Sequence, residues 1–253
     1  MRYFIDYAVR CERGNIRAKN QDNFLCLGNY LESENTGLTE ILKSLTDNKS
    51  RPMFAVFDGM GGEKYGETAA YLAAKSFNGF YDNSPKIDMK QFLSQVCSIM
   101  NEEICSFAKA KRTEHVGTTA AILAFDKKEV YICNIGDSRV FQYSGKSLTQ
   151  ISRDHVTSAV SDKKPALSQH LGISETEFII EPYIAKGEYS NKDRYLVCSD
   201  GLTDMVSEKE IEKMLSEHKT VSDCADALME NALSNGGIDN ITIILCELRK
   251  HRK

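Results

Sequence analysis

The short links between consecutive strand-like segments restrict the fold of this chain most. Runs rich in β-branched and aromatic residues, typical of strands, occur at 53–57, 119–125, 130–135, 139–143, 194–198 and 241–248. The link at residues 126–128 is too short to hold a crossover helix, so the strands that it joins must be antiparallel. Residues 136–138 are predicted to join the next pair in the same way. A doubly wound nucleotide-binding fold is therefore disfavoured.

Helical periodicity appears in two parts of the chain. Between residues 63 and 111, two segments carry apolar residues at spacings of three and four. A capping-box sequence at 207–210 predicts another helix, and a further one is predicted to begin after Ser222. Several strands are apolar at nearly every position, so both of their faces must be covered. We therefore predict an α+β fold, a four-layer αββα sandwich of two antiparallel β-sheets flanked by helices.

Length, composition and charge predict one folded domain over residues 1–253, with the polar stretch 32–51 as a surface excursion. The net charge of −4 argues against a nucleic-acid binder that works by bulk positive charge. No apolar run approaches the roughly 20 residues that span a bilayer. The first residues lack the apolar core of a signal peptide. We expect a cytoplasmic monomer without membrane or nucleic-acid partners.

Eight scattered cysteines contain no Cys-x-x-Cys spacing, so we expect free or buried thiols rather than a zinc site. For Cys198, two residues before Asp200, a buried strand thiol is favoured over a redox-sensitive one. The segment 144–147 ends like a phosphate-binding loop but lacks its first glycine, so it is interpreted as a hairpin turn.

Four aspartates stand at the margins of predicted strands: Asp22, Asp58, Asp200 and Asp239. One such acid alone is usually a turn or cap residue. If the four strand ends meet, their carboxylates repel one another unless cations fill the gap. Ligands that are all oxygen suit Mg²⁺ or Mn²⁺ better than Zn²⁺. Two such ions can activate a water and hold the oxygens of an in-line displacement at phosphorus.

Two further features support this hypothesis. Asp58 is followed by Gly59, where the lack of a side chain lets a metal shell approach the backbone. Arg17 lies shortly before Asp22, and its planar guanidinium suits a phosphate monoester dianion. Without the acids, a surface arginine would be an equally good interpretation of Arg17.

Seven short motifs stand in the order seen in metal-dependent Ser/Thr protein phosphatases. They are Arg17–Asp22, Phe57–Gly62, Gly117–Thr119, Gly136–Arg139, Asp154–His155, Ser199–Asp204 and Asp239–Thr242. The chain resembles the bacterial branch of the protein phosphatase 2C family over residues 13 to 247. The resemblance implies the αββα sandwich, two Mn²⁺ or Mg²⁺ ions to which the family adds a third, and hydrolysis of phosphoserine and phosphothreonine by metal-bound water.

The resemblance also implies roles for single residues. By position, Asp58 would bridge the two ions, and the Gly59 carbonyl would bind one of them. Asp200 and Asp239 would hold the other ion, while Asp22 would act directly or through water. The catalytic residues would be Asp58, Asp200 and Asp239 together with Arg17.

By the same resemblance, Arg17 would bind the substrate phosphate. The motifs 117–119 and 136–139 would be architectural, and His155 is expected to be structural. The partners implied are phosphorylated proteins, including a Ser/Thr kinase and its substrates.

The chain departs from the family pattern in several places. Met60 stands where eukaryotic relatives have a histidine proposed to protonate the leaving group, so that proton must come from elsewhere. Gln21 stands where many relatives have Glu. The family's third-metal aspartate, expected shortly before Gly117, is not evident, and Glu114 is the nearest acid. The flap between Asp154 and Gly172 looks shortened.

Two other functions were weighed. A catalytically silent module of the same fold would bind phosphoproteins, but it would be expected to lack one of Asp58, Asp200 and Asp239, and all three are present. A two-metal phosphodiesterase or nuclease is disfavoured by the net acidity and by the family resemblance. The sequence therefore predicts a Mn²⁺- or Mg²⁺-dependent phosphoprotein phosphatase.

Overall fold

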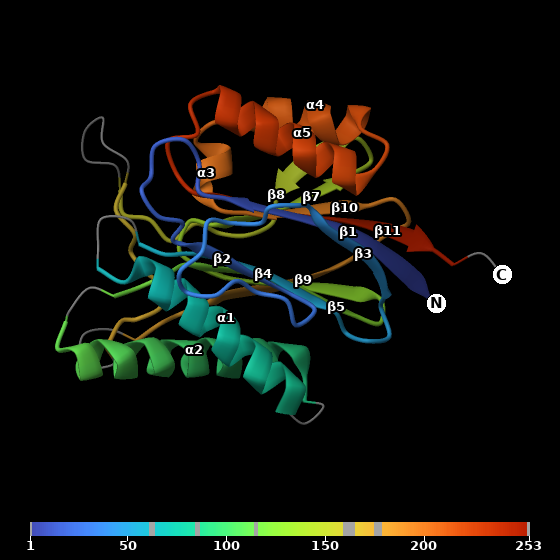
Figure 1. Cartoon of the computed structure of the whole chain (residues 1–253). Helices are drawn as coiled ribbons and strands as arrows, with labels where there is room; N and C mark the ends of the chain where they lie inside the picture. Colours follow the sequence, from blue (N-terminus) through green and yellow to red (C-terminus); the bar gives the residue numbers. More distant parts are fainter. Residues whose placement is uncertain are drawn as a thin grey trace.

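The computed structural model has two β-sheets at its centre and helices on both outer sides (Figure 1). It describes residues 2–60, 64–83, 87–113, 116–158, 165–174 and 179–251. All strand pairs within the two sheets are antiparallel. The predicted four-layer αββα sandwich is confirmed.

The first sheet has six strands in the spatial order β3, β1, β11, β10, β7, β8. Their bounds are Leu42–Asp47 (β3), Tyr3–Glu12 (β1), Ile241–Lys250 (β11), Arg194–Cys198 (β10), Arg139–Ser144 (β7) and Ser147–Gln150 (β8). The second sheet has five strands in the order β2, β4, β5, β6, β9. Their bounds are Asp22–Cys26 (β2), Met53–Asp58 (β4), Ala120–Asp126 (β5), Glu129–Ile135 (β6) and Tyr183–Glu188 (β9).

The helices form the two outer layers (Figure 1). Helices α1 (Gly66–Asn83) and α2 (Met89–Lys111) cover the five-stranded sheet. Helices α3 (Asp200–Thr203), α4 (Glu208–Glu217) and α5 (Val221–Ser234) lie on the six-stranded sheet. In the described part of the chain, none of the helices is both long and apolar enough to cross a membrane.

Strand β4 shows why these strands are apolar at successive positions. Phe54 and Val56 point into the core between the two sheets, whereas Ala55 and Phe57 pack under α1 and α2. Successive side chains of a strand point to opposite faces, so a strand with both faces covered needs apolar residues throughout. The reasoning from the sequence holds here.

The turn at 136–138 does not join an antiparallel pair, so that prediction was wrong. Strand β6 pairs with β5 and β9, whereas β7 pairs with β10 and β8 in the other sheet. Gly136 has a φ of +98°, and a Cβ there would lie 2.6 Å from the side chain of Thr119. The packing of Gly136 on Thr119 therefore accompanies the passage of the chain from one sheet into the other.

Other local predictions have mixed outcomes. The hairpin turn at 144–147 is confirmed, with positive φ angles at Gly145 and Lys146. The capping box between Ser207 and Glu210 is present. Helix α5 begins earlier than predicted, at Val221, because the side chain of Thr220 caps it. The stretch taken for a surface excursion contributes the edge strand β3, and β1, β8 and β9 were not predicted.

All eight cysteines lie in the described part of the chain and are free thiols, as expected. Cys198 is fully buried in β10, and its removal from water raises the pKa of the thiol to about 12. A thiol of this kind carries little thiolate, so the interpretation as a buried strand residue is supported.

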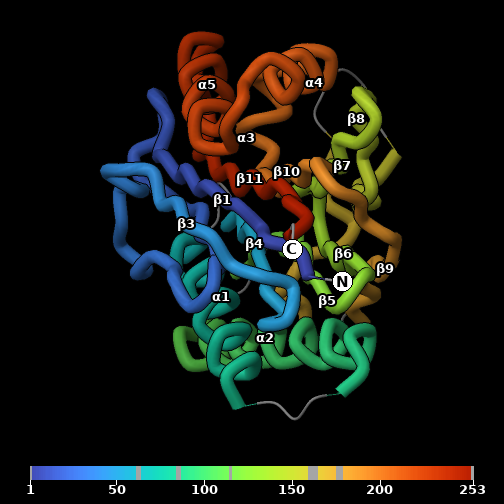
Figure 2. The backbone as a smooth tube through the Cα atoms, turned by 90° about the vertical axis from the view of Figure 1, so that its right-hand side faces the viewer, coloured from blue at the N-terminus to red at the C-terminus, as the bar shows by residue number. Residues whose placement is uncertain are grey.

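The two ends of the sandwich differ in what they carry. Tyr3 pairs with Lys250, so both chain ends lie together at one end, as Figures 1 and 2 show. Strand β1 runs from there to Glu12, which pairs with Ile241 at the other end. We call that other end the aspartate end, because all four predicted strand-margin aspartates lie there.

Candidate metal centre

The antiparallel register brings the four aspartates to one end of the molecule. In the five-stranded sheet, Asp22 at the start of β2 stands directly opposite Asp58 at the end of β4. In the six-stranded sheet, Cys198 at the end of β10 pairs with Ile243 near the start of β11. Asp200 therefore leaves its strand at the same end from which Asp239 enters β11.

Asp22 connects the two sheets. Its Oδ2 accepts hydrogen bonds from Ser199 Oγ at 2.8 Å and from Thr242 Oγ1 at 2.7 Å, both at the end of the six-stranded sheet. Burial raises the pKa of Asp22 to about 7; these hydrogen bonds oppose the shift, and nearby carboxylates add to it. The sheets are thus held together around a buried acid.

Asp58 lies at the centre of the charged groups. Removal from water raises its pKa well above the ordinary value, and the adjacent Asp200, which shares a hydrogen bond with it, is the next cause. The charges of Asp22 and Asp137 act in the same direction. Carboxylates this close repel one another, and a cation between them relieves the repulsion.

The donor set fits a hard divalent cation. Asp22 Oδ1 is buried and has no hydrogen-bond partner within the described chain, which leaves an acceptor oxygen to be satisfied. Its neighbours Asp58 and Asp200 supply further carboxylate oxygens, the ligands that Mg²⁺ and Mn²⁺ prefer. Among the described residues, however, no three Asp, Glu, His or Cys side chains are grouped so that they could hold a metal ion together.

Asp239 is held by an arginine. Its Oδ2 pairs with Arg17 Nη2 at 2.6 Å, so the carboxylate is partnered by an arginine. This hydrogen bond is the main cause of the raised pKa of Arg17, and the charges of Asp58 and Asp200 also act on the guanidinium. Arg17 therefore lies beside the acids, as the sequence predicted it would if they converged.

The loop that carries Arg17 is held by the segment before β11. The side chain of Asn240 donates to the carbonyls of Arg13 and Lys19 at 2.7 and 2.9 Å. Its Oδ1 accepts from the backbone N–H of Gln21 at 2.8 Å. These bonds fix the position of the Arg17 loop over the metal-ligand candidates.

The backbone of Asp58 is supported from below by the motif 117–119. Thr118 Oγ1 and the Thr119 N–H both donate to the Asp58 carbonyl at 2.9 Å. The Asp58 N–H donates to Thr119 Oγ1, which contacts Ser138 Oγ at 2.7 Å. The motifs 117–119 and 136–139 thus make the packing contacts that the sequence analysis assigned to them.

Gly59 cannot carry a side chain. A Cβ at this position would lie 2.3 Å from the carbonyl oxygen of Gly66, at the start of α1. The Gly59 N–H donates to the carbonyl of Gln21 at 3.1 Å. The close approach of β4, α1 and the Gln21 segment therefore requires glycine directly after Asp58.

Sequence reasoning missed Asp137, which it assigned to a turn. This aspartate is buried, and its charge acts on Asp58. It could have been singled out as the acid that directly follows strand 130–135. Glu114, the acid suggested for a third ion, lies outside the described residues, as does part of the predicted shortened flap, residues 159–164.

His155 contacts the same turn and has the structural surroundings expected of it. Its backbone N–H donates to the Gly136 carbonyl at 2.9 Å, and its Nδ1 accepts from the Gly136 N–H at 3.2 Å. Burial lowers its pKa, with Arg153 adding to the shift. His155 therefore stabilises the turn that carries Asp137.

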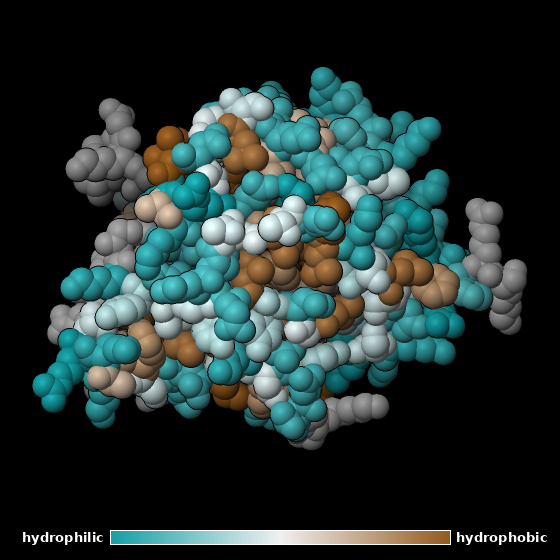
Figure 3. All heavy atoms as spheres, viewed as in Figure 1, coloured by the Kyte–Doolittle hydropathy of each residue, from teal (hydrophilic) through white to brown (hydrophobic). Residues whose placement is uncertain are grey.

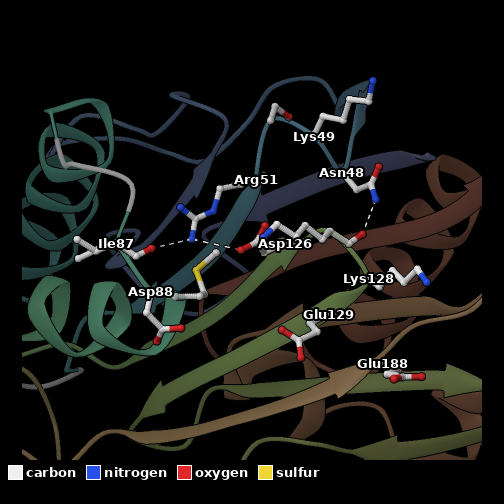
Figure 4. A pocket seen from close by; sticks show the side chains of 12 residues that line it. Asn48, Lys49, Arg51, Ile87, Asp88, Asp126, Lys128, Glu129 and Glu188 are labelled. Atoms are coloured by element: carbon white, nitrogen blue, oxygen red, sulfur yellow. Dashed lines mark hydrogen bonds and ion pairs between the residues drawn. The ribbon is translucent and has the colours of Figure 1, made fainter. Parts of the chain in front are cut away.

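A cavity of about 1260 Å³ lies at the opposite end of the five-stranded sheet, between the β3–β4 link and the β5–β6 turn (Figure 4). Side chains of both signs line it, and Arg51 reaches across to the Ile87 carbonyl and to Asp126. No predicted site residue is part of it. Asp22, Asp58 and Asp200, which we call the acid cluster, are therefore separate from this cavity.

Known proteins with similar sequences and folds were compared with the chain. The family model "Protein phosphatase 2C" matches residues 42–235. The serine/threonine phosphatase stp of Listeria monocytogenes is 30% identical over 257 residues, covering 94% of this chain and 94% of the relative. The serine/threonine protein phosphatase PstP of Mycobacterium tuberculosis is 29% identical, covering 96% of this chain and 45% of PstP.

A solved structure is also similar to this chain in its fold. The catalytic domain of PstP in complex with two manganese ions is 27% identical to this chain and has a TM-score of 0.78, covering 98% of this chain and 100% of that one. Because the family model alone matches well over half of the residues, the chain belongs to the protein phosphatase 2C family of phosphoric monoester hydrolases.

Proposed function

We propose that the protein hydrolyses phosphoserine and phosphothreonine in proteins and that it uses two Mn²⁺ or Mg²⁺ ions to do so. One observation carries the proposal. Asp22, Asp58 and Asp200 come from both sheets to one place, where a buried oxygen of Asp22 has no partner within the described chain. The two manganese ions in the PstP catalytic domain support the choice of cation.

The residues proposed as ligands are the strand-margin acids. Asp58, at the centre of the cluster, and the Gly59 carbonyl would hold one ion, with Asp58 also shared by the second. Asp200 and Asp239 would complete the second site, and Asp22 would act directly or through water. When bound, such ions lower the pKa of a coordinated water and neutralise part of the phosphate charge.

The buried Asp137 is a further carboxylate for an additional ion. Its charge acts on Asp58, so a cation placed between the two would relieve repulsion on both. Asp137 is therefore proposed in place of Glu114 as the acid for a third ion.

Arg17 is proposed to bind the substrate phosphate. Its Nη2 holds Asp239, but a guanidinium has five N–H donors in a planar fork, so other donors remain for phosphate oxygens. The Asp239 pair also orients the guanidinium toward the acid cluster, whose charges act on it. Arg17 would thereby place the phosphorus atom beside the ion ligands.

Met60 follows Gly59 and carries no exchangeable side-chain proton, so it cannot protonate the leaving group. Its backbone N–H donates to the Gly117 carbonyl at 3.0 Å, which gives the residue a structural role beside the site. The leaving hydroxyl is therefore proposed to receive its proton from water.

The decisive experiment is turnover of a phosphothreonine peptide during a Mn²⁺ titration, with Asp239→Ala as the matched variant. We expect release of phosphate that rises with Mn²⁺, stops on chelation and is strongly reduced in the variant. Release that persists in excess chelator would refute metal dependence. Binding of the phosphopeptide without any turnover would instead support the silent module, which the presence of all the acids disfavours.

The proposal extends to partners and location. Phosphorylated proteins, including a Ser/Thr kinase and the substrates of that kinase, would be the targets of a cytoplasmic phosphatase. Phosphate release from an autophosphorylated kinase would test whether the kinase is a substrate. Cell fractionation would test the cytoplasmic location.

A further inference from the structure

Two isoleucines are exposed to solvent beside the proposed phosphate-binding residue. Ile16 is 68% exposed and Ile238 is 51% exposed. They directly precede Arg17 and Asp239, the pair at the edge of the acid cluster. Single exposed aliphatic residues are ordinary, and Figure 3 shows hydrophobic atoms in a few groups on a largely hydrophilic face. Here, however, two exposed isoleucines stand directly before the two members of one ion pair.

The two isoleucines lie on loops that are bonded to each other on both sides of them. The Asn15 N–H donates to the Gly237 carbonyl at 2.7 Å, and Arg17 pairs with Asp239 at 2.6 Å. Ile16 and Ile238 are the residues between these two contacts, one on each loop. They therefore lie on adjacent loops at the surface, each directly before one member of the Arg17–Asp239 pair.

The same loops are held firmly. The Asn15 side chain donates to the carbonyls of Leu233 and Gly236 at 2.9 and 3.0 Å. Gly14 lies so close to the other loop that a Cβ would be 2.1 Å from the Asp239 carbonyl oxygen. The isoleucines are thus presented in a fixed place and pay little entropy when they bind a ligand.

A third apolar side chain lies next to Ile238. A Cβ on Gly236 would meet both Ile238 Cγ2 and Met205 Sδ at 3.7 Å, so these two side chains border the same small space. Met205 follows α3, the helix that begins at Asp200. We call Ile16, Ile238 and Met205 the aliphatic rim. A methionine in such a group can adapt to side chains of different shape.

We propose that the aliphatic rim binds an apolar side chain one or two residues from the phosphorylated residue of the substrate. The inference rests on the proposed phosphatase function. An extended peptide advances about 3.3 Å per residue, and adjacent Cα atoms of the enzyme are about 3.8 Å apart. A phosphate at Arg17 therefore brings the next substrate side chains onto Ile16 and Ile238, where apolar contact removes both partners from water.

The test compares two phosphothreonine peptides that differ only in the residues flanking the phosphothreonine, leucine in one and serine in the other. With wild-type protein, kcat/KM is expected to be about 5-fold higher for the leucine peptide, because contact on an open surface removes only part of the side chain from water. In the Ile16→Ser/Ile238→Ser double variant this ratio falls to about 1.

Leu45→Ser is the matched control variant. Leu45 is 55% exposed on the edge strand β3 and pairs with Asp6. Asp6 is six residues from Glu12 along β1, or about 20 Å from the aspartate end at 3.3 Å per residue. This variant loses an exposed aliphatic side chain away from the rim, and it should keep the wild-type preference for the leucine peptide.

The possible outcomes distinguish the role of the aliphatic rim from the phosphatase function. Equal turnover of both peptides by wild-type protein, or an undiminished preference in the double variant, overturns the role of the rim while the phosphatase function stands. Failure of wild-type protein to hydrolyse either peptide or p-nitrophenyl phosphate in Mn²⁺ overturns the phosphatase function and the rim with it. Circular dichroism melting curves show whether the variants are folded, as expected for exposed positions.

Discussion

The protein contains two groups of buried charges that are treated in opposite ways. Arg194 and Glu247 pair side by side across β10 and β11, with Arg194 Nε and Nη2 at 2.7 and 2.6 Å from Glu247 Oε2. The remaining donors of Arg194 reach the carbonyls of Leu215, His218 and Lys219 at the end of α4. Every charge in this group is answered by an opposite charge or a hydrogen bond.

The acid cluster shows the contrary arrangement. Asp22, Asp58 and Asp200 bring like charges together. Arg17, on which two of these charges act, is paired with Asp239. A buried charge that is unpaired costs stability unless a ligand pairs it. The Arg194–Glu247 pair is hydrogen-bonded throughout, whereas Asp22 Oδ1 has no hydrogen-bond partner within the described chain, so a bound cation would supply what this place lacks.

The largest expected effect comes from Asp58→Asn. Removing the central carboxylate should lower kcat on a phosphothreonine peptide on the order of 1000-fold, by loss of the positioned charge that holds the ions. In metal-free protein the same change should raise the free energy of unfolding, because it removes a repulsion. Urea denaturation followed by circular dichroism measures this, since the chain has no Trp. If Asp58→Asn instead has a lower free energy of unfolding than wild-type protein without metal, repulsion among the acids does not destabilise the protein.

The second effect is on the paired group. Arg194→Met removes the partner of Glu247 Oε2, leaves this carboxylate only the contact of Oε1 with Arg249 at 3.0 Å, and frees three carbonyls. This should cost about 3 kcal/mol of unfolding free energy. The double variant Arg194→Met/Glu247→Leu should recover part of this loss, because no unpaired charge remains. Turnover per folded molecule should be unchanged in both, since neither residue is part of the cluster. If kcat fell by more than the unfolded fraction explains, the Arg194–Glu247 pair would affect the acid cluster, contrary to this prediction.

A smaller effect is expected from Arg17→Lys. The charge is kept, but the ammonium cannot hold Asp239 and a phosphate through a planar fork, so kcat/KM should fall by about 10-fold. Steady-state kinetics with a phosphopeptide measure this change. Full activity in the lysine variant would show that charge alone suffices and that the observed guanidinium pair has no role in positioning.

The last prediction concerns the pH dependence of stability in metal-free protein. Asp22 has a pKa of about 7 in the folded protein against an ordinary 3.8, so the folded state holds the proton longer than the unfolded state. The unfolding free energy should therefore fall as pH rises from 3.8 toward 7, and then level off. Saturating Mg²⁺ should restore stability at the upper end of this range, because a ligand that binds only the folded state stabilises it.

Denaturation midpoints at several pH values, with and without Mg²⁺, measure this prediction. In Asp22→Asn the slope should become smaller, because only one of the two acids with a raised pKa, Asp58, still titrates. A slope that is equal in the variant and the wild-type protein would assign it to other groups.

Much of the fold was predictable because it depends on local patterns. The alternation along β4 places Phe54 and Ala55 on opposite faces, so apolar residues at successive positions already implied two covered faces. The capping box at Ser207 and the turn at Gly145 are equally local. Strand β3 was missed because Lys43 and Ser44 on an exposed edge resemble a polar loop.

Non-local contacts explain the rest. A Gly-Asp-Ser turn can close a hairpin or pass between sheets, and here its contact with Thr119 accompanies the second choice. Asp137, in the same turn, comes near enough to Asp58 for its charge to raise the pKa of Asp58, which no spacing in the sequence could show. The start of α5 moved for a smaller reason, because Thr220 and Ser222 are both acceptable caps and only one is used.

The sequence by itself determined the layers of this protein and the identity of the strand-margin acids, because side-chain periodicity and turn chemistry act over a few residues. Only the tertiary structure decided that Asp22 receives its hydrogen bonds from Ser199 and Thr242, and that Arg17 is partnered by Asp239 across 222 positions of the chain. Such pairings depend on how two sheets are stacked, and stacking depends on the shape of the whole core rather than on any one segment.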